Sequence, residues 1–97
     1  MKLQFTRVAL ADLDSILSYI AAESPRGAKR VQARIHAIID LIAEHPQIGP
    51  RTDNPAIRRM AVSPYPYLVF YEPMPDQVII HAVRHGARDP SGMPGAS

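Results

Sequence analysis

Arginine, tyrosine and histidine residues gather at the ends of apolar runs in the last third of this 97-residue chain. They are Arg58, Arg59, Tyr67, Tyr71, Arg84, His85 and Arg88. Guanidinium groups bind phosphate or carboxylate through paired hydrogen bonds, and an imidazole gains and loses protons near neutral pH. The set could therefore bind phosphate, transfer protons or hold an acidic partner protein.

One chemistry open to these residues is cleavage of RNA by attack of a 2′-hydroxyl on the neighbouring phosphate. That reaction needs a proton acceptor, a proton donor and cations that stabilise the developing negative charge. The candidates for the positive charge are Arg58, Arg59, Arg84 and Arg88. His85 would transfer protons, and Tyr71 is a second candidate for that role.

Each of these residues also has a purely structural interpretation. Arg58 and Arg59 are neighbours in an expected strand, so alternation sends them to opposite faces and one at most can reach a shared site. Tyr67 and Tyr71 share a face, in a period-two stripe that is typical of a core. His81 lies in a β-branched run, which favours a hydrogen-bonded strand histidine over a metal ligand. We expect no metal and no cofactor.

The elements that must position these residues begin with a short strand and two helices. Residues 2–5 alternate like a strand, and apolar residues then recur at spacings of three and four. Thr6 can cap the first helix, and Ser24-Pro25 is a start signal for the second, which should end near residues 45–46. Because very few residues join the helices, we expect an antiparallel hairpin.

A loop and three strands should complete the domain. Proline and glycine predict the loop over residues 46–55, and the strands are expected at 57–62, 66–72 and 77–84. The order strand, helix, helix, strand, strand, strand predicts an α+β fold, with the hairpin on a small, mainly antiparallel sheet. The other face of the sheet would stay open, and apolar surface there would mark a partner site.

Composition and the chain ends limit the class of protein. Hydrophobic residues make up 46% of the chain, and the absence of cysteine excludes disulfides and thiolate metal sites. Asp12 and Asp14 interrupt the first apolar run, so we expect a soluble, cytoplasmic protein without a signal peptide. Residues 1–90 should form a single domain, and residues 91–97 a flexible tail.

The kind of basic residue is more informative than the net charge, which is only +2. The chain contains nine arginines and two lysines. Arginine offers a rigid fork of donors that suits carboxylate or phosphate, whereas lysine is a hydrated point charge. The codon usage of a GC-rich genome would produce the same bias, so both explanations stay open.

Four groups of motifs, in order along residues 2–90, carry a resemblance to a known family. They are Ala11-Asp12-Leu13-x-x-Ile16-x-x-Tyr19-Ile20-Ala21 with Ser24-Pro25 and Ala28; Leu41-x-x-x-x-Pro46-x-x-Gly49; Ile57-Arg58 with Tyr67-x-x-x-Tyr71; and Ile80-x-x-Val83-x-His85-x-x-Arg88-Asp89-Pro90. In this order they resemble the RelE/ParE superfamily of toxins from type II toxin–antitoxin systems.

The resemblance implies a fold and two possible targets. Two helices would pack on an antiparallel sheet, and the C-terminal segment of an antitoxin would wrap and silence the toxin. Operator DNA would be bound only through the antitoxin. RelE-like members cut mRNA on the ribosome, whereas ParE-like members inhibit DNA gyrase and so block replication.

Three features resemble the ParE branch more closely. Gly86 follows His85, no aromatic residue follows Tyr71, and residues 46–56 carry Arg51 as their single basic residue. The resemblance therefore implies a gyrase inhibitor that limits growth and stabilises plasmids, and it makes an enzymatic activity doubtful.

Binding rather than catalysis is accordingly the expected activity. The residues expected to contact the antitoxin or the target are Arg58, Tyr67, Tyr71, Arg84, His85 and Arg88. One alternative is a RelE-like mRNA endonuclease that uses Arg58 or Arg59, with Arg84 and His85. Another is a partner protein without toxicity that serves only in autoregulation.

Overall fold

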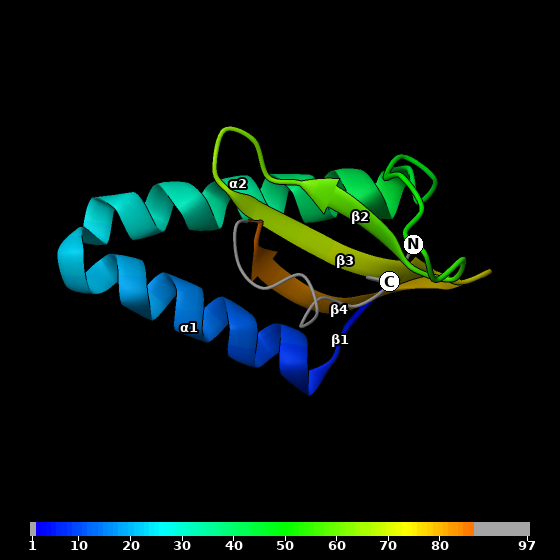
Figure 1. Ribbon diagram of the computed structural model, residues 1–97, viewed down its shortest axis with the longest axis horizontal. Coiled ribbons are helices and arrows are strands. Elements are labelled where there is room, and N and C mark those ends of the chain that lie inside the picture. The colour runs from blue at the N-terminus through cyan, green and yellow to red at the C-terminus, as the bar shows by residue number, and fades with distance from the viewer. Residues whose placement is uncertain (1, 87–97) are drawn as a thin grey trace.

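A helical hairpin packed on a four-stranded sheet makes up the computed structural model, which describes residues 2–86 (Figure 1). In chain order the elements are β1 (Lys2–Phe5), α1 (Arg7–Glu23), α2 (Pro25–Glu44), β2 (Arg58–Ala61), β3 (Tyr67–Pro73) and β4 (Gln77–His85). This order and the α+β class confirm the prediction, and each expected strand end lies within about one residue of the observed one. The predicted tail, residues 91–97, lies outside the described residues.

Both helices begin where the capping signals predict. Thr6 Oγ1 accepts the Ala9 N–H at 3.0 Å, and Ser24 Oγ accepts the Gly27 N–H at 3.0 Å. Such a side-chain cap satisfies one N–H that has no partner inside the helix and contributes about 1 kcal/mol. Ser24 also ends α1, because its own N–H donates to Ile20 O at 2.7 Å. The hairpin therefore turns on a single residue.

The sheet has the strand order β1-β4-β3-β2 and is mixed. β2 and β4 are antiparallel to β3, whereas β1 runs parallel to β4. Parallel neighbours need a long crossover connection, and the helical hairpin forms its first part. Between β3 and β4 the register shifts after Phe70, which leaves His81 as the extra residue of a bulge.

The core lies between the hairpin and the sheet. The buried residues of this cluster are Ala9, Val31, Ile35, Ile38, Ile39, Ile42, Val62, Val69, Tyr71, Val78, Ile80 and Val83. Each large aliphatic side chain removed from water stabilises the fold by about 1.5–3 kcal/mol. This core holds α2 across β3 and β4, and so sets the position of every strand-borne candidate residue.

The face of the sheet turned away from the helices carries a second, smaller cluster. Ile57, Phe70 and Ala82 are exposed by only 6%, 2% and 0%, and Leu68 packs against them. The expectation of a broad apolar surface on this face is therefore wrong at these positions, which are buried. The exposed large apolar side chains of residues 2–86 lie elsewhere, at Phe5, Val8, Leu10, Tyr19 and Ile48.

Candidate functional site

Tyr71 lies in the middle of the protein, under the loop that follows α2. Its hydroxyl donates to Pro46 O at 2.9 Å and accepts the Gly49 N–H at 2.9 Å. The residue is 0% exposed. Burial raises the pKa of the Tyr71 phenol above its ordinary value, against the opposing effects of the Gly49 N–H and the Arg58 charge. Tyr71 therefore fixes the loop, which corrects the expectation that its side chain contacts a partner.

Arg58 binds the same loop from β2. Its Nη1 donates to Gly49 O at 2.7 Å and to Gln47 O at 3.2 Å, while Nη2 donates to the side-chain oxygen of Gln47. Its backbone pairs with Tyr71 across the two strands. We call Pro46, Gln47, Gly49, Arg58 and Tyr71 the loop lock. Within it the guanidinium is used to hold backbone carbonyl groups.

Gly49 of the loop lock cannot be replaced by a residue with a side chain unless its neighbours move. A Cβ added there would lie 2.5 Å from Arg59 O and 2.7 Å from the Tyr71 hydroxyl. Contacts this short do not occur for real Cβ atoms, and one of the two neighbours is backbone. The spacing Pro46-x-x-Gly49 thus reflects a close approach of two chain segments.

A second group of candidate residues lies at the other end of β3. Tyr67 pairs with His85 across β3 and β4, and their rings meet edge to face, with centroids 5.6 Å apart and an interplanar angle of 87°. The pair is not apparent from the sequence, because no aromatic residue follows His85 in the chain. The neighbouring strand supplies one instead. Both residues are partly exposed, so this pair can reach a partner.

Arg84, beside this pair in β4, is joined to the first helix. Its Nη1 lies 3.4 Å from Asp12 Oδ1, and the other carboxylate oxygen of Asp12 accepts the Val83 N–H at 3.0 Å. The Arg84 side chain is 36% exposed, so solvent screens the ion pair and its contribution is about 1 kcal/mol or less. Arg84 thus has a structural partner on α1, which the sequence did not predict.

The structure does not gather the predicted site residues in one place. Arg58 lies opposite Tyr71, whereas His85 lies opposite Tyr67. Tyr67 and Tyr71 are four residue steps apart along β3, and at about 3.3 Å per step this is a separation of about 13 Å. Arg59 faces away from Arg58 by strand alternation, as predicted. Arg88 lies outside the described residues.

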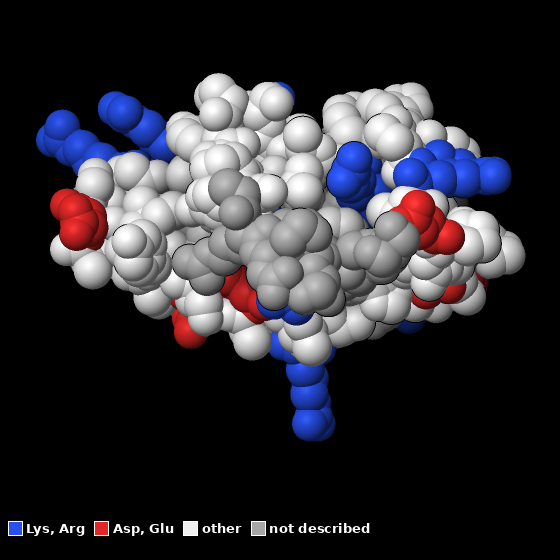
Figure 2. Space-filling model, in the orientation of Figure 1, with Lys and Arg blue, Asp and Glu red and all other residues white. Residues whose placement is uncertain are grey.

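The basic residues that the structure describes do not form one continuous patch on the face that carries β2 and β3. In Figure 2, lysine and arginine side chains project from opposite ends of that face, and acidic residues lie among them. A nucleic-acid surface usually concentrates positive charge along one stripe. The described residues of this face therefore show no such stripe.

The described part of the chain holds neither a cluster of metal-ligating side chains nor a helix that could span a membrane. In residues 2–86, no three His, Asp or Glu side chains lie close enough together to hold a metal ion. His81 Nε2 lies 2.9 Å from Glu72 Oε1, which confirms its interpretation as a hydrogen-bonded strand histidine. Neither α1 nor α2 is long and apolar enough to cross a membrane.

Comparison with known proteins gives sequence matches that are described as toxins. Residues 3–90 match the family described as the ParE toxin of type II toxin-antitoxin system, parDE. Toxin RelE2 from Caulobacter vibrioides is 39% identical over 80 residues, which cover 82% of this chain and 89% of that protein. Putative toxin Y4kP from Sinorhizobium fredii is 34% identical over 70 residues, covering 72% of this chain and 73% of its own length.

A solved structure shows the same fold. It is described as the chromosomal ParDE TA system from P. aeruginosa, and it matches with a TM-score of 0.73. The match covers 88% of this chain and 95% of that chain, at 22% sequence identity.

Proposed function

The chain belongs to the ParE toxin family of type II toxin–antitoxin systems, and from this premise we propose that it inhibits DNA gyrase and so stops replication. Its partner is a cognate antitoxin, as the family implies. We place the activity in the cytoplasm, where gyrase works on chromosomal and plasmid DNA. Inhibition would arise by binding, with no bond broken by the toxin itself.

The main support for this proposal is the set of hydrogen bonds that Arg58 makes within the protein. A ribonuclease needs cations directed at the scissile phosphate. The guanidinium of Arg58 instead donates to Gln47 and Gly49 in the loop lock. Most of its N–H donors therefore bind groups of the protein itself, which supports a binding protein over a catalyst.

The distance along β3 supports the same conclusion. His85 is the natural proton carrier of the set, yet it lies about 13 Å along the sheet from the register position of Arg58. General acid–base catalysis requires groups within hydrogen-bonding reach of the same substrate atoms. Among the described residues, the arginine adjacent to His85 in the chain is Arg84, and it pairs with Asp12.

A supercoiling assay tests the proposal. Purified toxin is added to DNA gyrase, relaxed plasmid and ATP, and we expect the yield of supercoiled plasmid to fall with toxin concentration. Prior mixing with the co-purified antitoxin should restore it. Transcript ends from cells that express the toxin alone are mapped in parallel. Discrete cuts within translated messages, with gyrase unaffected, would refute gyrase inhibition.

One observation favours a second candidate, a ribosome-dependent mRNA endonuclease. The edge-to-face contact of Tyr67 and His85 places a phenol beside an imidazole, and both are groups that transfer protons. Arg84 is the adjacent residue in β4. Toxin RelE2 of Caulobacter vibrioides, whose name is that of the other branch, is also among the relatives. The transcript mapping described above distinguishes the two activities.

A further inference from the structure

The first two turns of α2 carry basic side chains that are open to solvent. Arg26, Lys29 and Arg30 are all exposed. Because residues three and four positions apart are neighbours on a helix surface, these side chains form one group, which we call the α2 cluster. It lies next to the turn between the two helices (Figure 1), at one of the two ends from which basic side chains project in Figure 2.

No carboxylate among the described residues neutralises the α2 cluster. The ion pairs found in residues 2–86 are His81–Glu72 and Arg84–Asp12, and neither includes a residue of α2. Glu23 ends α1 close to the cluster in the chain, yet it forms no ion pair with a described cation. The charge of the cluster is therefore available to another molecule.

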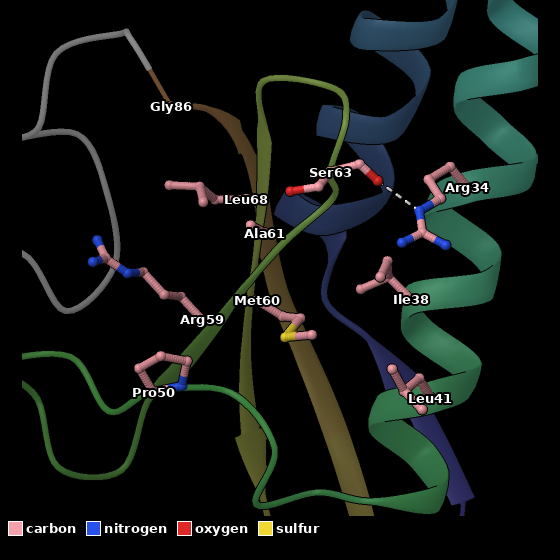
Figure 3. Close-up of a pocket in the computed structure, with 10 residues that line it drawn as sticks. All are labelled: Arg34, Ile38, Leu41, Pro50, Arg59, Met60, Ala61, Ser63, Leu68 and Gly86. Carbon is pink, nitrogen blue, oxygen red and sulfur yellow. Dashed lines mark hydrogen bonds between the residues drawn. The ribbon is translucent and has the colours of Figure 1, made fainter.

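Arg34, one helical turn further along α2, is bound within the protein and marks the end of the cluster. Its side chain turns toward the segment after β2, where Nε donates to Ser63 O at 2.7 Å (Figure 3). The free cations thus extend from Arg26 to Arg30. At about 1.5 Å per residue, these four steps span about 6 Å of the helix axis.

The α2 cluster lies where the helix dipole disfavours positive charge. The start of a helix is the positive end of its dipole and attracts acidic residues, whereas the end attracts basic ones. In α2 the first turn contains no acidic residue and the last turn no basic one, and the acidic residues Asp40 and Glu44 lie in the second half. Arg26 and Arg30 also repel each other at a spacing of four. An anion bound here would relieve both effects.

We propose that the α2 cluster binds the backbone phosphates of duplex DNA. Each strand of B-DNA carries a phosphate about every 3.4 Å along the helix axis, so the span of about 6 Å corresponds to neighbouring phosphates on one strand. Guanidinium groups bind phosphate through paired hydrogen bonds. Such contacts hold the protein on DNA without reading its sequence.

In the cell these phosphates belong to the DNA on which gyrase acts, so the toxin contacts the enzyme and its substrate together. This role rests on the proposed function, whereas the binding of DNA itself does not. A folded protein partner is a poorer match, because protein surfaces usually mix charges of both signs. A phosphate backbone instead offers one sign at a regular spacing.

Direct binding is measured with the purified full chain and a fluorescein-labelled duplex of about 20 base pairs that lacks an operator sequence. Fluorescence anisotropy is recorded at salt concentrations from about 50 to 200 mM. Three phosphate contacts predict a slope of about −2.7 for the logarithm of the binding constant against the logarithm of the salt concentration. Absent binding at the lowest salt, or a slope near zero, would overturn the proposal.

Arg26→Gln and Arg30→Gln each remove one cation of the cluster. Each should weaken binding about tenfold at the lowest salt and make the slope shallower by about 0.9. Arg30→Lys keeps the charge and should retain most of the slope. Because the glutamine variants remove repulsion, their unfolding midpoints should equal or exceed that of the unaltered chain. A loss of DNA binding in a folded variant is then a loss of contact.

Arg7→Gln is the matched control, since it removes one exposed positive charge from the first residue of α1. Sixteen residue steps of about 1.5 Å place Arg7 about 24 Å along α1 from the interhelical turn. Its effect on affinity should stay within about twofold, as expected for long-range steering alone. Equal losses for Arg7→Gln and Arg30→Gln would overturn the proposal. So would equally tight binding of a polyglutamate chain with the same number of charges, which would assign an acidic protein instead.

The supercoiling assay tests the role of the contact in inhibition. The double variant Arg26→Gln/Arg30→Gln should need at least about tenfold more toxin for half-maximal inhibition of gyrase. Unchanged inhibition by this variant would overturn a contact with the DNA that gyrase holds. If the unaltered chain binds DNA but leaves gyrase active, gyrase inhibition is refuted and the DNA site stands, so the two failures are distinguishable.

Discussion

The carboxylate of Asp12, on α1, accepts the backbone N–H of Val83, in β4, at 3.0 Å, although the two residues lie 71 positions apart. β1 pairs with β4 only as far as Phe5 opposite Ile80. Beyond that point the outer edge of β4 would present unpaired backbone groups, which invite association with other strands. Thr6 acts similarly, since its hydroxyl donates to His81 O at 2.9 Å. Side chains from the start of α1 thus continue the edge that β1 begins.

Replacing Asp12 tests this edge contact. Asp12→Ala should leave the Val83 N–H without its partner and lower the free energy of unfolding by about 1–3 kcal/mol. Hydrogen exchange at Val83 should become faster. Asp14→Ala, on an exposed position of the same helix, should change stability by about 0.5 kcal/mol or less. Equal effects of the two substitutions in urea denaturation would contradict a specific role for Asp12.

Gly49→Ala should destabilise the protein, because its Cβ would meet Arg59 O at 2.5 Å and the backbone cannot move away without disturbing β2. We expect a loss of about 1–3 kcal/mol, the usual range for overpacking. Gly86→Ala is the matched control, since its nearest described neighbour would be Pro66 O at 3.5 Å, an ordinary contact. The measurement is the midpoint of unfolding of each variant, and equal midpoints would contradict a close approach specific to Gly49.

Tyr71→Phe removes the hydroxyl at the centre of the loop lock. The Gly49 N–H and Pro46 O would both lose a hydrogen-bond partner, and a loss of about 1–3 kcal/mol is expected from the unpaired buried donor. Tyr19→Phe removes a hydroxyl from a residue that is 73% exposed and should have little effect. Chemical denaturation measures both. A neutral Tyr71→Phe would mean that the loop holds its shape without the phenol.

The raised pKa of Tyr71 predicts a dependence of stability on alkaline pH. In the unfolded chain this phenol loses its proton near pH 10, and in the folded protein at a higher pH. Between those values the folded state holds the extra proton, so stability should fall as pH rises above about 10 and level off above the folded pKa. Tyr71→Phe should fall less steeply in urea denaturation across this range. Identical slopes for both proteins would argue against the burial of the phenol.

His85→Ala separates the two candidate activities. If the toxin acts by binding gyrase, growth inhibition should decrease only modestly, because one contact among several is removed. If His85 transfers protons in RNA cleavage, the rate should fall by about 10²–10⁴. Tyr67→Phe is a useful companion, since it keeps the ring that contacts His85 and removes the hydroxyl. Dose–response growth curves at matched toxin levels, followed by immunoblotting, provide the measurement.

The candidate site was predictable in its residue types but not in its grouping. Pro73 lies opposite Val78 across the last turn, and an unbroken ladder counted back from there would place Tyr67 opposite Arg84. The bulge at His81 moves His85 into that position instead. No local sequence pattern in this segment predicts such a bulge. The distance between Arg58 and His85 depends likewise on the strand register, which the sequence does not specify.

The sequence by itself determined the elements and their order, because caps, turns and hydrophobic periods depend on residues only a few positions apart. Thr6 and Ser24 mark both helix starts, and alternation correctly separated Arg58 from Arg59. The tertiary structure alone decided what the polar residues do. Contacts such as Tyr71 with Gly49 and Asp12 with Val83 join distant segments, and their partners emerge only once the core fixes how the hairpin lies on the sheet.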